Sequence, residues 1–233
     1  KGIPRGTVKS MRIFTYHFAY QGMGGLLGVV GMDGPWDIKR VVGTVPVNED
    51  GSAKFRIPAN LPISLQPLDA DGKALQLMRS WMTAMPGEVV QCTGCHEPQN
   101  TAPVARQTIA LNSEPATIEP WHGPMRGFSY PREVQPVVTK YCVGCHDGEK
   151  REDGQTIPSL RGDVKITDWA QITPGRGGDR GGKFSVGYYE LSRYVRRPGI
   201  ESDYHLLEPM EFHAGTTQLV QMLEKGHHGV KLD

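Results

Sequence analysis

The sequence lacks the features that would place it in several common classes of protein. No apolar run approaches the roughly 20 residues that a membrane-spanning helix requires, so no such span is predicted. Basic residues number 26 and acidic residues 25, a balance that gives no reason to expect a nucleic-acid partner. Hydrophobic residues make up only 38% of the chain, whereas glycine (29) and proline (18) are abundant. We therefore expect a loop-rich fold in which a bound apolar group supplies part of the core.

Cysteine is equally scarce, and its four copies fall in two matching patterns. These are Cys92-Thr93-Gly94-Cys95-His96 and Cys142-Val143-Gly144-Cys145-His146. Cys-x-x-Cys-His is typical of c-type haem attachment, in which both thiols bond to haem vinyl groups and the histidine ligates the iron. The spacing suits one side of a helical turn. Two covalent haem c groups are predicted, held by Cys92, Cys95, Cys142 and Cys145, with His96 and His146 as proximal ligands.

Two other interpretations of the cysteines fit less well. Zinc ribbons place their cysteine pairs roughly 15–20 residues apart, much closer than these pairs lie. A zinc site of four cysteines would also leave the two following histidines unexplained. A thioredoxin-like redox pair needs a strand-to-helix setting, which neither motif has.

The predicted fold class is α+β, with a domain boundary between residues 125 and 126. Residues 1–125 are expected to form a small β-sandwich-like domain that carries the first haem c. A strand pattern at Val8–Tyr20 and two hairpin signals support this prediction. In the first hairpin, Thr44–Val47 and Ala53–Ile57 flank a turn at Asn48–Gly51, and the second has its turn at Asp69–Gly72. The Asp-x-Asp-Gly of the second turn lacks the rest of a calcium loop and indicates turn chemistry.

Residues 126–233 are expected to form a mainly α, cytochrome c-like domain that carries the second haem c. Val134, Val137, Val138 and Tyr141 recur at helical spacing just before the second motif. Pro136 is tolerated there if it lies in the first turn. A final helix is predicted over Thr216–Lys225. The glycine-rich segment 175–183 resembles a phosphate loop only superficially and is interpreted as a surface loop.

The distal iron ligands decide between electron transfer and small-molecule chemistry. For the second haem the candidates are His227 and then His228, because glycines flank them after a helix, with Met210 as the next choice. For the first haem the candidates are His17, followed by Met82 and His122. His205 and His213 are expected to make surface or supporting hydrogen bonds.

The compartment follows from the cofactor, because haem c is attached outside the bacterial cytoplasm. A periplasmic or other extracytoplasmic location is therefore expected. No signal peptide or starting Met is present, which suggests a processed chain or an excerpt of a longer one. The expected partners are redox proteins or other subunits of a multihaem complex.

Six segments recur together in one family. They are Asp33–Asp37, Gly43–Val47, Ala84–Glu88, Cys92–Asn100, Tyr141–Gly148 and Gly226–Leu232. With them the chain resembles the middle and C-terminal parts of the hydrazine synthase alpha subunit, without that family's N-terminal β-propeller. The resemblance implies one haem c in each part, a multisubunit complex, and chemistry that joins nitric oxide and ammonium into hydrazine. It also implies two histidine ligands for the second haem, with the distal one late in the chain.

One position departs from the family. There, a tyrosine four residues after the first motif's histidine ligates the iron, and the histidine turns to zinc. This sequence has Asn100 at that place, which cannot supply a phenolate. His96 is therefore expected to ligate the first haem. The predicted function is electron transfer by a dihaem c-type cytochrome. The alternative is a haem enzyme of nitrogen-oxide or hydrazine chemistry at the first haem, and a weaker one is a subunit that spaces haems in an assembly.

Overall fold

The structure, a computed structural model, describes residues 3–16, 39–76, 78, 80–93, 104, 106–166, 184–196 and 210–232. The chain divides into two compact units. Unit 1 comprises Lys1–Phe18, Ile38–Gly127 and Pro198–Ala214, and unit 2 comprises Ala19–Asp37, Phe128–Arg197 and Gly215–Asp233. The domains predicted at 1–125 and 126–233 remain a prediction.

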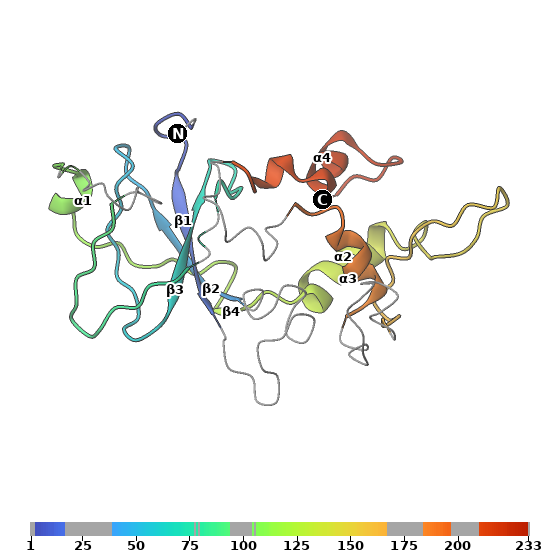
Figure 1. Ribbon diagram of the computed structural model, residues 1–233, viewed down its shortest axis with the longest axis horizontal. Helices are drawn as coiled ribbons and strands as arrows, with labels where there is room; N and C mark the ends of the chain where they lie inside the picture. Colours follow the sequence, from blue (N-terminus) through green and yellow to red (C-terminus); the bar gives the residue numbers. More distant parts are fainter. Residues whose placement is uncertain are drawn as a thin grey trace. The chain divides into compact units, whose positions relative to one another are not determined.

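Unit 1 is built on one antiparallel sheet with the strand order β3-β1-β2-β4 (Figure 1). The strands are β1 (Ser10–Tyr16), β2 (Lys39–Pro46), β3 (Ile63–Leu68) and β4 (Arg126–Gly127). β1 lies between β2 and β3, so its backbone is paired on both sides. A short helix, α1 (Ile109–Asn112), completes the regular structure described in this unit.

The core of unit 1 lies against the middle of this sheet. Ile13, Val45 and Ile63 come from three neighbouring strands and are at most 1% exposed. Each such aliphatic side chain stabilises the fold by about 1.5–3 kcal/mol relative to an exposed one. Partly buried hydrophobic residues surround the three: Met11, Val42, Phe55, Ile57, Leu61, Leu65, Met82 and Ile118.

Gly43 in β2 allows another segment to approach the sheet closely. A Cβ there would lie 2.2 Å from the carbonyl oxygen of Glu119. The neighbouring Thr44 exchanges two backbone hydrogen bonds with Glu119, of 2.8 and 2.9 Å. A side chain at position 43 would therefore push the 116–119 segment away from the strand.

Both predicted turns form, but the first predicted hairpin does not. The N–H of Asn48 bonds to Ser52, and the N–H of Asp69 bonds to Lys73. Asp69 also accepts the N–H groups of Asp71 and Lys73, which confirms turn chemistry at this site. The segment predicted to pair with β2, Ala53–Ile57, instead makes one isolated bridge from Phe55 to Ala116.

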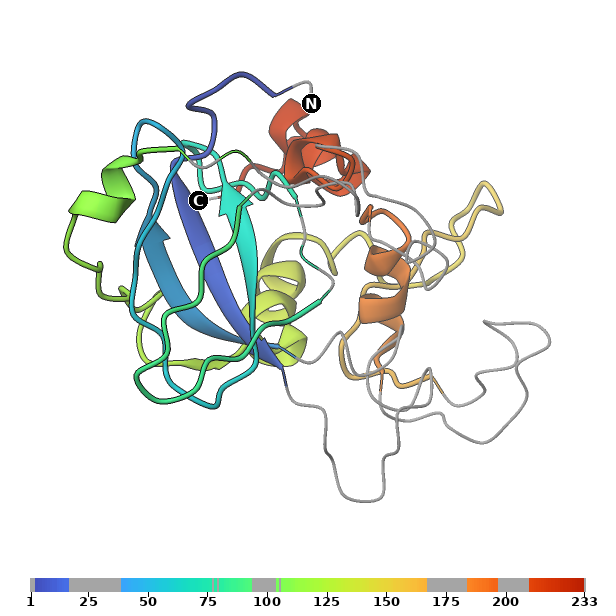
Figure 2. The same ribbon diagram turned by 60° about the vertical axis from the view of Figure 1, so that its left-hand side comes forward.

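Unit 2 is built from short helices. A π-helical turn (Tyr130–Val134) leads into α2 (Gln135–Tyr141), followed by α3 (Val186–Ser192) and α4 (Gln218–Lys225). Figure 2 shows α2 in yellow-green, α3 in orange and α4 in red. A 3-10 turn, Ala214–Thr216, precedes α4 where the chain passes from unit 1 to unit 2.

The predicted helices before the second motif and near the C-terminus are both confirmed. Pro136 lies in the first turn of α2, where its missing N–H costs no helical bond. α4 ends at Gly226, whose φ of 90° only glycine adopts readily. The hydroxyl of Ser185 caps α3 by accepting the N–H of Tyr188 at 3.2 Å.

The sheet and helices together confirm the α+β class. The described residues contain one sheet, so the second layer of a sandwich is not among them. The segment 175–183 lies outside the described residues. No helix in the described part of the chain is long and apolar enough to cross a membrane.

Candidate haem-binding site

The second Cys-x-x-Cys-His motif continues α2 as a tight turn. Cys142 caps the helix, and its N–H bonds to the carbonyl of Val138 at 2.9 Å. The carbonyl of Cys142 then accepts the N–H groups of Cys145 at 3.1 Å and His146 at 2.8 Å. These bonds wind the motif back on itself. The turn therefore holds two thiols and one imidazole within one stretch of five residues, as attachment of a macrocycle requires.

The ring of His146 is oriented by a backbone carbonyl. Its Nδ1 lies 3.2 Å from the carbonyl oxygen of Pro158. Because a carbonyl only accepts, Nδ1 carries the proton and Nε2 keeps the lone pair that a metal takes. Metal-bound histidines commonly donate their second ring N–H to a carbonyl in this way. The main chain of His146 is fixed as well, since its carbonyl accepts the N–H of Leu160 at 2.9 Å.

His227 is presented by a tight turn that follows α4. Its carbonyl accepts the N–H of Val230 at 2.9 Å. The two central residues, His228 and Gly229, have φ of 48° and 79°. Two positive φ values in succession are typical of a type I′ turn, which glycine, asparagine and aspartate adopt most readily. This turn holds the two adjacent histidine rings almost perpendicular, at 82°, with centroids 4.5 Å apart.

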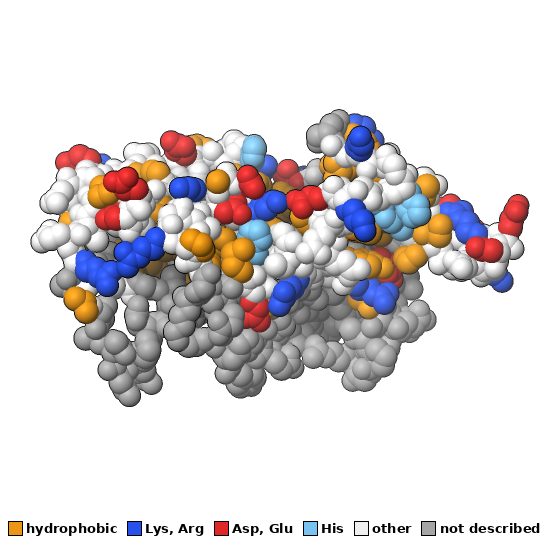
Figure 3. Space-filling view, turned by 90° about the horizontal axis from the view of Figure 1, so that it is seen from above, with side chains coloured by type: hydrophobic (Ala, Val, Ile, Leu, Met, Phe, Trp, Pro, Cys, Tyr) orange, Lys and Arg blue, Asp and Glu red, His pale blue; other side chains and the backbone are white. Residues whose placement is uncertain are grey.

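The rings of His146 and His227 approach each other at a distance that suits one shared metal ion. Their centroids are 6.0 Å apart and their planes are tilted by 33°. Imidazole nitrogens bind transition metals at about 2 Å, so two rings on opposite sides of one ion have centroids about 6 Å apart. On the face drawn in Figure 3, histidine side chains gather beside hydrophobic ones. His146, in the motif, and His227, in the C-terminal turn, therefore fit an axial pair.

Burial shifts the pKa of two groups at the site, one imidazole and one thiol. Burial lowers the pKa of His227, and the neighbouring His228 and His146 lower it further, so its ring is neutral at pH 7. Burial raises the pKa of the Cys142 thiol, with Cys145 adding to the effect. Among the described residues no three histidines, cysteines or carboxylates gather into a metal site.

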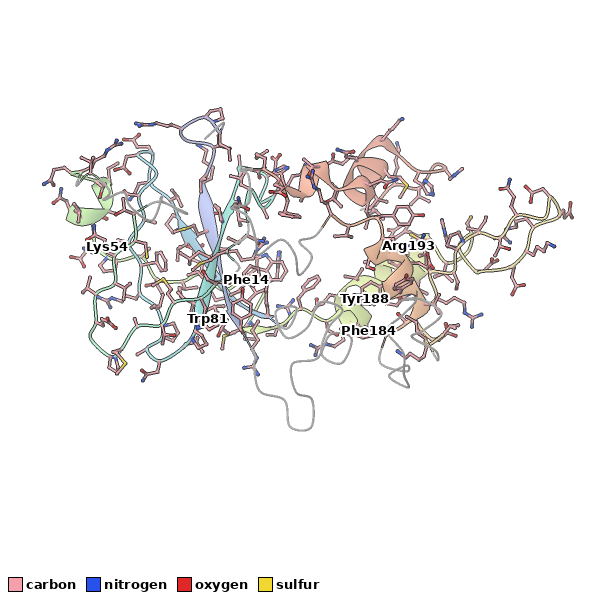
Figure 4. All side chains as sticks on the ribbon, viewed as in Figure 1. Phe14, Lys54, Trp81, Phe184, Tyr188 and Arg193 are labelled. Atoms are coloured by element: carbon pink, nitrogen blue, oxygen red, sulfur yellow. The ribbon has the colours of Figure 1, made fainter. Side chains whose placement is uncertain are left out.

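An aromatic cluster lies beside the motif in unit 2. Tyr188 stacks on Phe184, with centroids 5.5 Å apart, and meets Tyr130 edge-on at 5.0 Å (Figure 4). The hydroxyl of Tyr130 is buried without a hydrogen-bond partner. Burial, followed by the nearness of Cys142 and Tyr188, raises the pKa of Tyr130 to about 12. This cluster supplies apolar cover next to the first thiol of the motif.

The remaining candidates for the second haem lie elsewhere. Met210 belongs to unit 1, where its N–H bonds to the carbonyl of Leu75 at 3.1 Å. His213, expected to make a surface or supporting hydrogen bond, is buried in unit 1 and lies 2.9 Å from the carboxylate of Asp69. His205 lies outside the described residues. The ring arrangement thus favours His227 over His228 and Met210, and the assignment of a ligand stays a prediction.

The first motif is described only at its start. Cys92 is exposed, while Cys95, His96, His17 and Asn100 lie outside the described residues. Met82 pairs with Ile63 through two backbone hydrogen bonds and packs against the core of unit 1. His122 is exposed beside Trp121, with a φ of 49°. The distal ligand of the first haem therefore remains a prediction.

Two residues that support the site were missed by sequence reasoning. Pro158 offers only a backbone carbonyl, and no sequence pattern marks a carbonyl as a partner of His146. Arg151 donates to the carbonyl of Cys145 at 2.6 Å and to the carboxylate of Asp147. Asp147 and Arg151 are four residues apart, but that spacing predicts an ion pair only within a helix, and this segment is not helical. No sequence signal therefore marked the contact.

Comparison with known proteins points to one family. Residues 6–97 match the family described as "Hydrazine synthase alpha subunit middle domain". The solved structure "Kuenenia stuttgartiensis Hydrazine Synthase" resembles this fold with a TM-score of 0.57 at 17% identity. That match covers 82% of this chain but only 30% of the solved chain. No curated protein matches the sequence.

Proposed function

Starting from the relation of this chain to the hydrazine synthase alpha subunit family, we propose that it is a dihaem c-type protein that transfers electrons. The observation that carries the proposal is the pair of imidazoles in unit 2, His146 and His227, whose rings are 6.0 Å apart. Cys142 and Cys145 would hold the second haem c covalently. Cys92 and Cys95 would hold the first, with His96 as its proximal ligand.

Two strong axial ligands favour electron transfer over substrate chemistry. A haem iron binds and transforms small molecules when its sixth position is open or weakly held. With His146 on one side and His227 on the other, both axial positions would be taken. The type I′ turn around His228 fixes His227 at a short distance from its partner, which opposes its exchange for an external ligand.

A second candidate is hydrazine-synthase-like chemistry at the first haem. It is favoured by the family match over residues 6–97, which ends just after His96. Position 100, where the family has an iron-binding tyrosine, carries asparagine here. The two candidates therefore differ at the first haem and agree at the second.

The proposal extends to partners and compartment. A relative described as an alpha subunit supports association with other subunits or redox proteins. Attachment of haem c supports a periplasmic or other extracytoplasmic location. Spacing haems within such an assembly is a weaker third possibility.

The test combines mass, spectrum and ligand binding on the chain produced in a host that matures haem c. We expect a mass increase of two haems and no carbon monoxide binding by the reduced second haem. His227→Ala should convert that haem to a form that binds carbon monoxide, whereas the matched variant His228→Ala should keep the low-spin spectrum. A protein mass without any added haem would refute the proposal. Fast carbon monoxide binding by the first haem in the unaltered protein would favour the enzyme.

A further inference from the structure

The guanidinium of Arg151 contacts the backbone of the second motif. Arg151 lies on a small hairpin that follows the motif, in which Lys150 pairs with Thr156. The backbone of Arg151 is held there, because its N–H bonds to Gln155 at 2.8 Å and its carbonyl accepts the N–H of Gly154 at 2.9 Å. The side chain then reaches back from this fixed base to the motif.

Arg151 binds the carbonyl of Cys145, for which the described part of the chain offers no backbone N–H partner. The carbonyl of Cys142 accepts two motif N–H groups, and that of His146 accepts Leu160. The partner of the Cys145 carbonyl is a side chain, Arg151 Nη2, at 2.6 Å. The last carbonyls of a helical turn lack partners within the turn, and a basic side chain can cap them.

Asp147 orients this guanidinium. Its two carboxylate oxygens accept Arg151 Nη2 at 3.0 Å and Nη1 at 3.2 Å, a two-bond arrangement that fixes the plane of the group. One carboxylate oxygen also accepts the N–H of Glu149 at 2.9 Å. About a third of each partner's side chain is exposed, at 35% and 31%, so the ion pair contributes little to global stability. The Arg151–Asp147 pair therefore adds little stability, but its fixed direction suits a role in positioning the Cys145 peptide.

We propose that Arg151 is a positioning residue that holds the Cys145 peptide so that the Cys145 thiol meets its vinyl group. This inference rests on the proposed covalent attachment of haem at the second motif. Attachment adds the thiol across a carbon–carbon double bond. The sulfur bonds to the vinyl carbon next to the ring, the thiol hydrogen goes to the terminal carbon, and no electrons are gained or lost. Cys142, fixed by α2, would attach without help from Arg151.

The test measures the second thioether separately from haem content. Mass alone cannot count thioethers, since the addition changes no atom count. The matured protein is therefore unfolded, its free thiols are alkylated, and the labelled peptides are identified, while the pyridine haemochrome α-band reports any vinyl group left. Arg151→Gln removes one charge-assisted hydrogen bond that orients the loop. Labelling at Cys145 should therefore rise about tenfold. Labelling at Cys142 should stay at its original level.

Further variants test whether the position of Arg151 or only its charge matters. Arg161→Gln removes the same charge from another two-bond pair, with Asp163 at 2.6 and 3.0 Å, and should leave Cys145 unlabelled. Arg151→Lys keeps the charge but loses the planar fork, and should label like Arg151→Gln. Cys145→Ser gives the reference spectrum of a haem with one thioether. If Arg151→Gln fails to accumulate, Asp147→Asn serves instead and should show a smaller rise of the same kind.

The outcomes distinguish the inference from the function on which it rests. Equal labelling of Cys145 in the unaltered protein and in Arg151→Gln would overturn the inference while leaving haem attachment intact. Normal attachment in Arg151→Lys would overturn it too, because charge alone would then suffice. A chain without haem at Cys142 would overturn both.

Discussion

Unit 1 and unit 2 achieve their folds by different means. In unit 1 the sheet buries Ile13, Val45 and Ile63 almost completely within one cluster. In unit 2 the described helices have seven or eight residues, and α4 buries none of its side chains although it is strongly amphipathic. Isolated helices shorter than about 12–15 residues are marginal in water. Among the described residues, unit 1 therefore has one dense core, whereas unit 2 buries fewer hydrophobic side chains, which are Val138, Leu160 and Ile166. The haem proposed for unit 2 would add to that smaller core.

The largest difference between the two units is expected when haem attachment at the second motif is removed. In the double variant Cys142→Ser, Cys145→Ser we expect unit 2 to lose hydrogen-exchange protection in α2, α3 and α4. The sheet of unit 1 should keep its protection, because its core contains no part of unit 2's site. Hydrogen exchange read by mass spectrometry on peptides of each unit gives the answer. Unchanged protection in α4 would show that unit 2 folds without its cofactor.

Removing part of the unit 1 core should give the converse result. Ile63→Ala leaves a cavity where the residue is 0% exposed and should destabilise unit 1 by about 2–5 kcal/mol. Protection in β1 and β3 should fall by the corresponding factor, while the spectrum of the second haem, proposed in unit 2, should stay the same. Val89→Ala, at a residue 92% exposed, is the matched control and should change little. An equal loss in both variants would contradict a localised core.

The close packing of Gly187 against Leu160 provides a test of unit 2 alone. A Cβ at Gly187 in α3 would lie 2.4 Å from the carbonyl oxygen of Leu160, a backbone atom that cannot move cheaply. Gly187→Ala should therefore cost about 1–3 kcal/mol, as overpacking does. The effect should be measured as lowered thermal stability of the haem spectrum, because Leu160 also holds His146. Glu152→Ala, at an exposed position outside the motif, is the control and is expected to be neutral.

The smallest effect is a pH-dependent one in unit 1. Burial of Asp69 raises its pKa, but hydrogen bonds from His213, Lys73 and Asp71 outweigh it, and the pKa lies below its ordinary value. A lowered folded pKa contributes stability above the unfolded value of about 3.9, and this is lost as the pH falls through the folded pKa. Asp69→Asn should cost about 1 kcal/mol at pH 7 and less at pH 3, where part of the contribution of the carboxylate is already lost. Denaturation at both pH values tests this, and a difference that grows in acid would contradict it.

Local patterns carried most of what could be predicted. The helix before the second motif followed from apolar spacing that ends at Tyr141, and the two turns followed from their aspartates, asparagine and glycines. His227 was singled out because glycines flank it, and the structure gives those glycines a role in a tight turn. Each of these features depends on residues a few positions apart, where backbone sterics and side-chain periodicity decide the conformation.

Pairings between distant residues could not be predicted. His213 meets Asp69 across 144 positions, and β4 pairs with β2 across most of unit 1. Phe55 was expected in a hairpin with its neighbour in sequence, but it bridges to Ala116. Such contacts are chosen by the packing of the whole unit, because many segments of similar propensity compete for one edge of a sheet.

The carbonyl of Pro158 would have an electronic consequence for the haem ligand proposed at His146. By accepting the Nδ1 proton it would give the ring partial imidazolate character, and a more electron-rich donor would favour ferric over ferrous iron. The main chain would then tune the reduction potential of the proposed haem. Substitution of Pro158 would keep the acceptor atom, whereas a shift in the path of residues 156–160 would lengthen the bond and raise the potential.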